Sequence, residues 1–258
     1  METGAITQYV DVAQIVLYLF WLFFAGLIYY LVRENHREGY PMETGREKGP
    51  KVTGWPVPEP KTYKMADGHE VQAPDVHRPD GTYQGQAAWG WSGAPLDPVG
   101  NPLLAGVGPG AWAQRADVPD MTHHGEPKIV PLRVATDHQV SVRDTNPIGL
   151  PVIGGDGDVA GHVSDLWVDR SEALFRYLEV TLTDGQRVLT PMPFARIRAT
   201  EVIVNSILSS QFGQVPPLRH ADQITLLEEE KVAAYYGAGT LYATPKRQEP
   251  LRSEEHTS

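Results

Sequence analysis

The chain has 258 residues and a formal net charge of −10, because 32 acidic side chains outnumber 22 lysines and arginines. It contains no cysteine, which excludes disulfides, thiolate catalysis and cysteine-ligated zinc or iron–sulfur sites. No segment clusters basic residues, so nucleic acid is not expected as a partner, since phosphate binding requires such a cluster.

An apolar run extends from Val12 to Val32 and is interrupted only by Gln14. A helix of this length, at 1.5 Å per residue, covers roughly 30 Å, the hydrocarbon thickness of a bilayer. No second run of this kind follows. The sequence therefore predicts a single membrane-spanning helix over residues 12–32.

The flanking charges predict the orientation of this helix. Glu2 and Asp11 precede it, whereas Arg33 and Arg37 follow it, and positively charged flanks stay in the cytoplasm. Residues 1–11 are then a short periplasmic N-terminus, and the bulk of the chain is cytoplasmic. A cleaved signal peptide would instead begin with basic residues and end at small ones.

Residues 33–127 form a predicted surface strap. Proline and glycine recur every few residues and hydrophobic periodicity is absent, so this segment cannot form a core by itself. It contains Trp55, Trp89, Trp91 and Trp112, which disordered linkers usually lack. We expect an irregular segment whose aromatic side chains dock on another surface, with a flexible linker as the alternative.

The following segment, residues 128–251, changes to a hydrophobic period of two. Leu178, Val180 and Leu182 alternate with polar residues, Asp184-Gly185 supplies a turn, and a return strand runs to Thr190, which predicts a β-hairpin. Several short antiparallel strands favour a small barrel or sandwich. Two further strands are expected, Gly161–Asp169 and Glu201–Asn205.

One helix is predicted near the end of this domain, over Leu226–Tyr236. Thr225 can cap it, Glu228 lies at capping-box distance, and Gly237 can stop it. The last residues, 252–258, resemble a translated sequencing adapter and are expected to be a non-native tail, with a polar disordered tail as the alternative.

Several uncommon motifs occur in one order along nearly the whole chain, and together they resemble the H subunit of the purple bacterial photosynthetic reaction centre, a PRC-barrel family. The motifs are Phe20-Trp21, Ala25–Leu31, Arg37–Pro41, Gly108-Pro109, Asn146–Val152, Trp167–Asp169, Leu226–Glu229 and Ala243–Arg247.

This resemblance implies a fold with a single transmembrane helix, a cytoplasmic, mainly-β PRC-barrel domain with one or more short helices, and a long irregular surface segment. It implies the L and M subunits and membrane lipids as partners, with a cytochrome subunit and light-harvesting antenna in the wider complex. The location implied is the bacterial inner, intracytoplasmic photosynthetic membrane.

The resemblance also implies that this chain is not an enzyme and binds no cofactor itself. Bacteriochlorophyll, bacteriopheophytin, quinones, non-haem iron and carotenoid belong to partner subunits in that family. The predicted helix agrees, because it contains no histidine that could ligate a bacteriochlorophyll magnesium.

The implied function is to cap the cytoplasmic face over the secondary quinone and to help carry protons to it. A quinone reduced twice inside a low dielectric must take up protons, because a buried dianion is prohibitively desolvated. Those protons must come from the cytoplasm through ionisable groups.

The first relay residue that the resemblance implies is Glu172, followed by Asp169. Burial is expected to raise the pKa of Glu172, while Arg176, one turn away if the segment is helical, opposes that shift. Arg176 and Arg115 are expected to tune the electrostatics of the relay. From the residues alone, a salt-bridged surface carboxylate and a strand end remain the alternatives.

A second group, Asp120, His123, His124 and Glu126, matches the acid and histidine cluster where the family takes up protons. Histidine has an unperturbed pKa of about 6.5 and exchanges protons readily near neutral pH. Thr122 replaces an acid of the family pattern and Glu126 replaces a histidine, so the details of proton uptake differ here.

The sequence offers little support for metal binding or for two other function classes. The His123–His124 cluster has no second ligand set, so no functional metal is expected, and Asp156-Gly157-Asp158 is expected to be a turn, since Trp167 stands where a calcium loop needs glutamate. A hydrolase lacks its nucleophile motif. A membrane-anchored PRC-barrel adaptor unrelated to photochemistry remains an alternative.

Overall fold

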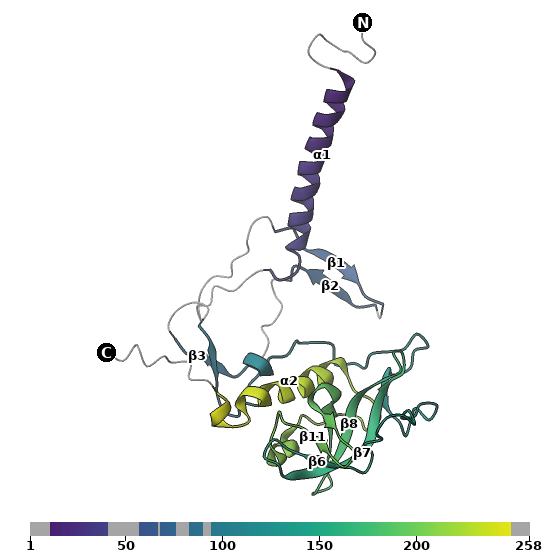
Figure 1. Cartoon of the computed structure of the whole chain (residues 1–258). Coiled ribbons are helices and arrows are strands. Elements are labelled where there is room, and N and C mark those ends of the chain that lie inside the picture. The colour runs from purple at the N-terminus through teal and green to yellow at the C-terminus, as the bar shows by residue number, and fades with distance from the viewer. Residues whose placement is uncertain (1–10, 41–56, 67, 76–82, 90–93, 249–258) are drawn as a thin grey trace, which may run out of the picture. The chain divides into compact units, whose positions relative to one another are not determined.

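The computed structural model describes residues 11–40, 57–66, 68–75, 83–89 and 94–248 (Figure 1). The predicted periplasmic residues 1–10, the tail 252–258, and Trp55 and Trp91 lie outside the described residues. The chain divides into two compact units, one comprising Met1–Asp80 and Trp89–Ala94 and the other Gly81–Ala88 and Pro95–Ser258. The second half of the predicted strap therefore belongs to the same unit as the β domain.

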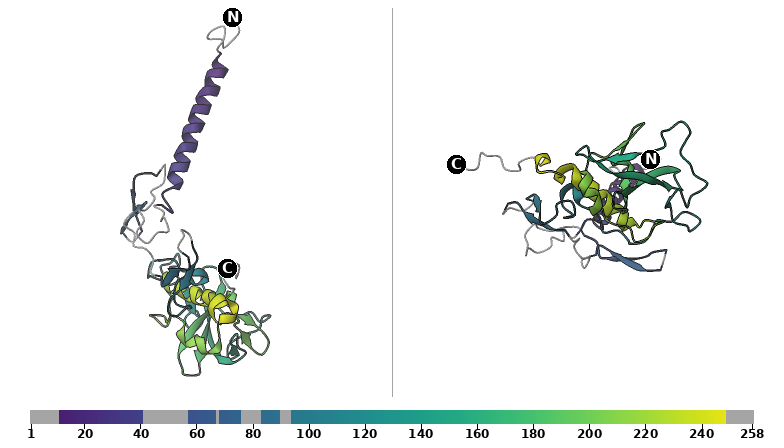
Figure 2. Two further views of the ribbon diagram at one scale, coloured as in Figure 1. Left: turned by 90° about the vertical axis from the view of Figure 1, so that its left-hand side faces the viewer. Right: turned by 90° about the horizontal axis from the view of Figure 1, so that it is seen from below.

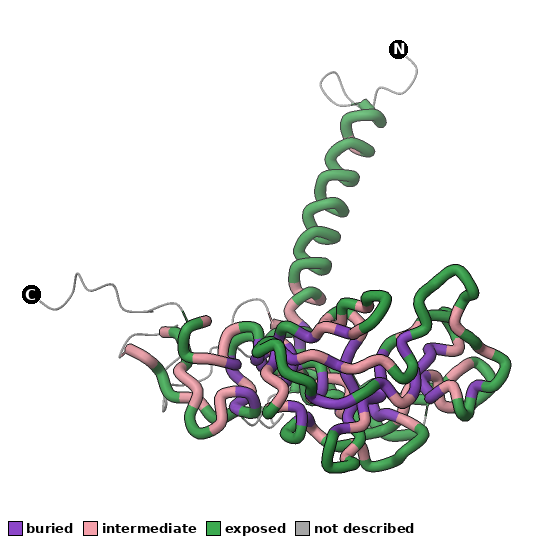
Figure 3. The backbone as a smooth tube through the Cα atoms, turned by 60° about the horizontal axis from the view of Figure 1, so that its bottom comes forward, coloured by how far each residue is buried: buried purple, intermediate pink, exposed green. Residues whose placement is uncertain are grey.

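Helix α1, Val12–Asn35, confirms the predicted apolar helix and ends three residues later than expected. Asp11 caps it, because its Oδ1 accepts the Gln14 N–H at 2.8 Å and the Gln14 side chain accepts the Asp11 N–H at 3.3 Å. The one polar residue of the apolar run thus serves the cap. No side chain of α1 is buried, and the helix is long and apolar enough to cross a membrane (Figure 3).

The foot of α1 is fastened to a two-stranded hairpin by Arg37, whose side chain is only 8% exposed. Its guanidinium binds both carboxylate oxygens of Glu34, at 2.6 and 3.0 Å, and donates to the carbonyls of Glu59 and Ala73 at 2.7 and 3.1 Å. The hairpin consists of β1 (Lys61–Lys64) and β2 (Glu70–Ala73), paired antiparallel.

The strap is therefore less irregular than predicted. Besides β1 and β2 it contains a second antiparallel pair, β3 (Gly85–Ala87) with β4 (Leu96–Pro98), and a 3₁₀ turn η1 (Gly108–Gly110). These strands have three or four residues each, too few to show a hydrophobic period in the sequence. Short pairs of this kind depend on the surface beneath them.

The β domain is built on a seven-stranded sheet, in the order β10-β11-β6-β7-β8-β9 with β5 paired to β7. All of its strand pairs are antiparallel except β11 with β6. The strands are β5 (Ile129–Pro131), β6 (Pro151–Ile153), β7 (Val159–Asp169), β8 (Leu174–Leu182), β9 (Arg187–Pro191), β10 (Arg196–Ile197) and β11 (Val202–Ile203).

Most of the strand predictions are confirmed. The predicted hairpin is β8 with β9, and the strand expected at Gly161–Asp169 is β7. The strand expected at Glu201–Asn205 is reduced to the two residues of β11. Three further 3₁₀ turns follow, η2 (Met192–Phe194), η3 (Ser209–Gln214) and η4 (Pro245–Arg247).

Helix α2, Leu226–Tyr242, lies against this sheet and closes its core (Figure 2). Its start is as predicted, since Thr225 Oγ1 accepts the Glu228 N–H at 3.1 Å and the Glu228 carboxylate accepts the Thr225 N–H at 2.8 Å. Its aromatic pair Tyr235 and Tyr236 is buried in one cluster with Trp167.

The prediction that Gly237 stops this helix is wrong. A Cβ at Gly237 would lie 2.5 Å from the carbonyl oxygen of Pro109, so the glycine allows η1 to approach the helix and the helix continues past it. Trp112, just after η1, is half-buried and lies under Lys231, whose Nζ is 5.1 Å from the ring centroid. Docking of the strap is thus confirmed at Trp112, through a cation–π contact.

Candidate proton-transfer site

The predicted proton-collecting residues lie in a tight exposed turn. Met121 pairs with Pro127 across it, and Gly125 takes a φ of +78°. Thr122 closes the turn, because its N–H donates to the Glu126 carbonyl at 2.7 Å and its hydroxyl accepts the Glu126 N–H at 3.3 Å. The residue that departs from the family pattern therefore has a local structural function.

His123 and His124 are exposed in this turn, with ring centroids 5.4 Å apart. The Glu126 carboxylate is 60% exposed and pairs with the Arg170 Nη1 at 2.9 Å, just beyond the end of β7. This brings the turn alongside the residues that follow Asp169. The structure thus brings the two predicted groups of relay residues close together, although they lie more than 40 residues apart in the chain.

Lys128 connects the two groups, and the sequence analysis missed it. Its ammonium lies 3.4 Å from Asp120 Oδ2 and 3.5 Å from Asp169 Oδ2, while its side chain is 19% exposed. Desolvation lowers the pKa of Lys128, but the neighbouring Asp169 and Asp120 outweigh that effect and raise this pKa above its ordinary value. Lys128 therefore stays cationic between the two carboxylates.

Asp169 ends β7 and is fully buried. Its Oδ1 accepts the N–H groups of Ser171 and Glu172 at 3.0 and 3.1 Å, which fixes the turn that follows. Its Oδ2 is buried and has no hydrogen-bond partner within the described part of the chain. That oxygen instead lies between two cations, Lys128 and the Arg176 Nε at 3.6 Å.

Glu172 is exposed in this chain, in the turn between β7 and β8. The segment is not helical: Ala173 has a φ of +52° and Arg176 already lies in β8. The helical spacing on which the expected effect of Arg176 on Glu172 depended is therefore absent, and Arg176 pairs with Asp169. The predicted burial of Glu172 is not provided by the described residues of this chain.

Glu229, in the first turn of α2, is a further ionisable member that the sequence analysis did not select. It accepts the Tyr177 hydroxyl at 3.0 Å. Burial raises its pKa, the hydrogen bond from Tyr177 and the charges of Arg176 and Arg115 oppose the rise, and Asp120 adds to it. The sequence contains a signal for Glu229: Glu228 forms the capping box, so the adjacent Glu229 is not needed for the cap.

Arg115 lies close to the start of α2, with its Nη1 3.6 Å from Glu230 Oε1. Its charge opposes the rise in the pKa of Glu229, and its part in the electrostatics of the predicted relay stays a prediction. Asp120, Arg115 and Arg176 all influence the one carboxyl group whose pKa is raised among the described acids with a resolved shift.

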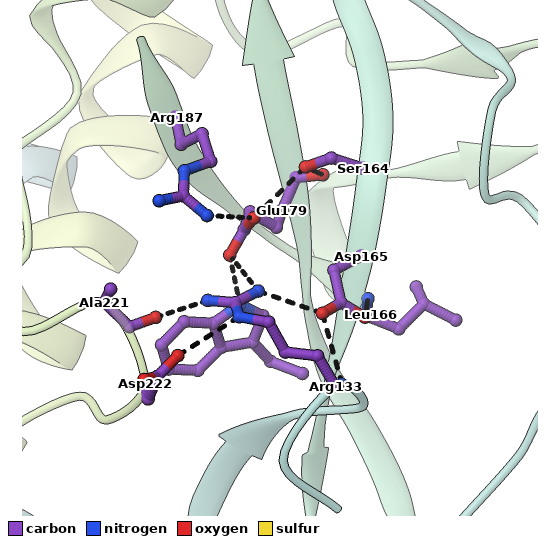
Figure 4. A network of polar contacts seen from close by, with 9 residues as sticks. Arg133, Ser164, Asp165, Leu166, Glu179, Arg187, Ala221 and Asp222 are labelled. Carbon is purple, nitrogen blue, oxygen red and sulfur yellow. Dashed lines mark hydrogen bonds and ion pairs between the residues drawn. The ribbon is translucent and has the colours of Figure 1, made fainter. Parts of the chain in front are cut away.

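A second buried carboxylate, Glu179 in β8, has a different environment (Figure 4). It is 4% exposed and accepts hydrogen bonds from Arg133 Nη1 at 2.9 Å, Trp167 Nε1 at 3.1 Å, Ser164 Oγ at 3.2 Å and Arg187 Nη1 at 3.4 Å. Arg133 also binds Asp165 and Asp222, at 2.9 and 3.1 Å. This network joins β7 and β8 to the loop before α2.

No group of three or more metal-binding side chains occurs among the described residues. Asp156, considered for a calcium loop, instead accepts the Ser209 hydroxyl at 2.7 Å and the backbone N–H of Ser209 and Asp158. Residues 155–157 form the predicted turn.

Comparison with known families decides what these elements belong to. Residues 4–134 match the photosynthetic reaction centre H-chain N-terminal region, and residues 140–211 match the PRC-barrel domain. The first match alone covers just over half of the 258 residues. The chain belongs to the photosynthetic reaction centre H-chain family.

This H chain is thus a structural subunit of a photosynthetic reaction centre, and its apolar α1 fits a single-pass membrane protein. The hydrolase and the unrelated adaptor are set aside by this family membership. The H-chain match includes Asp120, the histidine pair and Lys128, the barrel match includes Asp169 and Glu172, and Glu229 lies beyond both.

Proposed function

We propose that this H chain caps the cytoplasmic face of the L and M subunits, stabilises the secondary quinone site and conducts protons from the cytoplasm to the reduced quinone. The observation that carries the proposal is one line of ionisable contacts. It begins at Asp120, whose side chain is 46% exposed, passes Lys128 to the buried Asp169, and reaches the backbone N–H of Glu172.

Each member has a distinct part in this proposal. His123 and His124 are exposed and the Asp120 side chain is 46% exposed, so all three can contact water at the start of the line. Lys128 and Arg176 remain cationic and compensate the charge of buried Asp169, whose unbonded Oδ2 can accept a proton. Glu172 is exposed at the end of the line, where a partner subunit would cover it.

Glu229 extends the relay in this proposal. General acid–base groups work best when their pKa approaches the ambient pH, and burial moves the pKa of Glu229 in that direction. Its bond to Tyr177 holds the carboxyl in place beside the charges of Arg176 and Asp120.

The orientation and the cofactors complete the proposal. The N-terminus is periplasmic and the β domain cytoplasmic, since Arg33 and Arg37 follow the membrane-spanning stretch. Pigments, quinones and non-haem iron are assigned to the partner subunits by the family resemblance, and α1 agrees for the pigments, since it has no histidine to ligate a magnesium. Near-infrared absorption of the complex purified with this chain tests the partners: bacteriochlorophyll bands with a light-bleachable donor are expected, and a stable colourless preparation would refute them.

The relay is tested by Glu172→Gln and Asp169→Asn in the intact complex. Primary charge separation should be unchanged, whereas proton-coupled transfer of the second electron should slow by about tenfold or more, because a general acid–base group is lost. Flash-induced absorbance gives both rates. Glu201→Gln is the matched control, since this carboxylate pairs with Arg198 at 3.2 Å outside the relay. Unchanged second-electron rates would remove the substituted residue from the relay.

A further inference from the structure

The hairpin β1–β2 has one face that is apolar and exposed. Tyr63 is paired with Val71 in the register, and side chains at paired positions project to the same face. Tyr63, Val71 and the adjoining Met65 are 45, 41 and 47% exposed. Alternation places Lys61 on this face too, whereas Thr62 and Gln72 project to the opposite, polar face.

This face is turned toward the membrane-spanning helix. The Lys61 ammonium reaches back along the chain to Glu34 in the last turn of α1, at 3.0 Å. The buried Arg37 binds Glu34 and, at the other end of its guanidinium, the carbonyls of Glu59 and Ala73 that bracket the hairpin. The base of the hairpin is therefore held at the foot of α1 (Figure 1).

The distance of the hairpin base from the hydrocarbon layer follows from helix geometry. The apolar run ends at Val32 and α1 ends three residues later, at Asn35, which corresponds to about 4–5 Å along the helix axis. Arg37 lies in the turn directly after the helix. The headgroup layer on each side of a bilayer is about 5–7 Å thick. A hairpin fastened there therefore lies at headgroup depth.

We propose that the face formed by Lys61, Tyr63, Met65 and Val71 lies against the phospholipid headgroup layer and acts as a second membrane contact of the chain. Tyrosine favours this interface because its ring is apolar and its hydroxyl polar. Lys61 is exposed on this face, and its ammonium suits lipid phosphates. Continuity with the spanning helix favours lipid over a protein partner as the occupant.

The absence of cysteine in the natural chain makes spin labelling a direct test. Tyr63→Cys and Val71→Cys place a nitroxide on the apolar face, and Thr62→Cys and Gln72→Cys place one on the polar face of the same hairpin. The labelled complexes are reconstituted in vesicles of phosphatidylcholine and phosphatidylglycerol, with the unsubstituted complex as a blank. Power saturation compares collisions with oxygen, which concentrates in lipid, and with a water-soluble nickel chelate.

Labels at 63 and 71 are expected to show an oxygen-to-nickel ratio severalfold above that of labels at 62 and 72. Equal ratios that favour nickel at all four positions would show that the hairpin stands in water and would overturn the proposal. Labels at 63 and 71 that are immobilised and shielded from both reagents would overturn it as well, because a protein surface would then cover the face. Two labels per face guard against a single variant that misfolds.

Discussion

Two buried carboxylates on neighbouring strands differ in how they are satisfied. Glu179 in β8 accepts hydrogen bonds from four side chains, including the buried indole N–H of Trp167. Asp169 at the end of β7 uses one oxygen to fix a turn, and its other oxygen lies between two cations with no hydrogen bond from the described residues. Glu179 is thus held by hydrogen bonds from several elements, whereas Asp169 Oδ2 is held by charge alone among the described residues.

The largest effect is expected for Glu179→Ala. The substitution removes the acceptor of the buried Trp167 N–H and one carboxylate partner from each of Arg133 and Arg187, although Arg133 keeps Asp165 and Asp222. The free energy of unfolding should therefore fall by about 3 kcal/mol. Urea unfolding of the full chain in detergent, followed by tryptophan fluorescence, measures this. Arg187→Ala is the control and should cost less than about 1 kcal/mol, because that side chain is 53% exposed. Equal losses of stability in the two variants would contradict the prediction that Glu179 holds the fold together.

A smaller loss of stability is expected for Asp169→Asn, about 1–2 kcal/mol. The asparagine oxygen can still accept the N–H groups of Ser171 and Glu172, and the two cations that lose their charge partner reach water, since Lys128 and Arg176 are 19 and 43% exposed. The same unfolding experiment applies. A loss as large as that of Glu179→Ala would make Asp169 a structural residue.

Lys128→Met should lower the free energy of unfolding by about 1 kcal/mol. The matched Arg176→Met should lower it less, because Lys128 is more buried and contacts two carboxylates.

The same Lys128→Met substitution weakens the charge compensation of Asp169, so second-electron transfer should depend more steeply on pH than in the natural complex. Flash kinetics between pH 6 and 9 measure this slope. An unchanged slope in Lys128→Met would mean that the connection between Asp120 and Asp169 has no functional part.

The smallest effect is expected for Glu229→Gln and concerns pH. Burial raises the pKa of Glu229 above its ordinary 4.5, so the stability contributed by its protonated form is complete below pH 4.5 and is lost as pH rises through the raised pKa. The glutamine variant lacks this loss and should be slightly more stable than the natural chain at neutral pH. Thermal midpoints from pH 4 to 8 test it, and parallel curves for both chains would contradict it.

Local signals in the sequence determined much of this fold. The apolar length of α1, the alternation and turn residues of β8 and β9, and the capping box of α2 each lie within one continuous stretch of the chain. Such signals fix where elements begin and what type they are, because they depend on the backbone and its nearest neighbours.

Tertiary contacts decided the rest. The prediction for the end of α2 was wrong because Gly237 is needed for the close approach of Pro109, which is distant in the chain. The connection of Asp120 to Asp169 depends on Lys128, and the pKa of Glu229 depends on burial against β8. Pairing partners, burial and charge compensation are properties of residues brought together across the fold, so composition and spacing could suggest the candidate relay residues but could not arrange them.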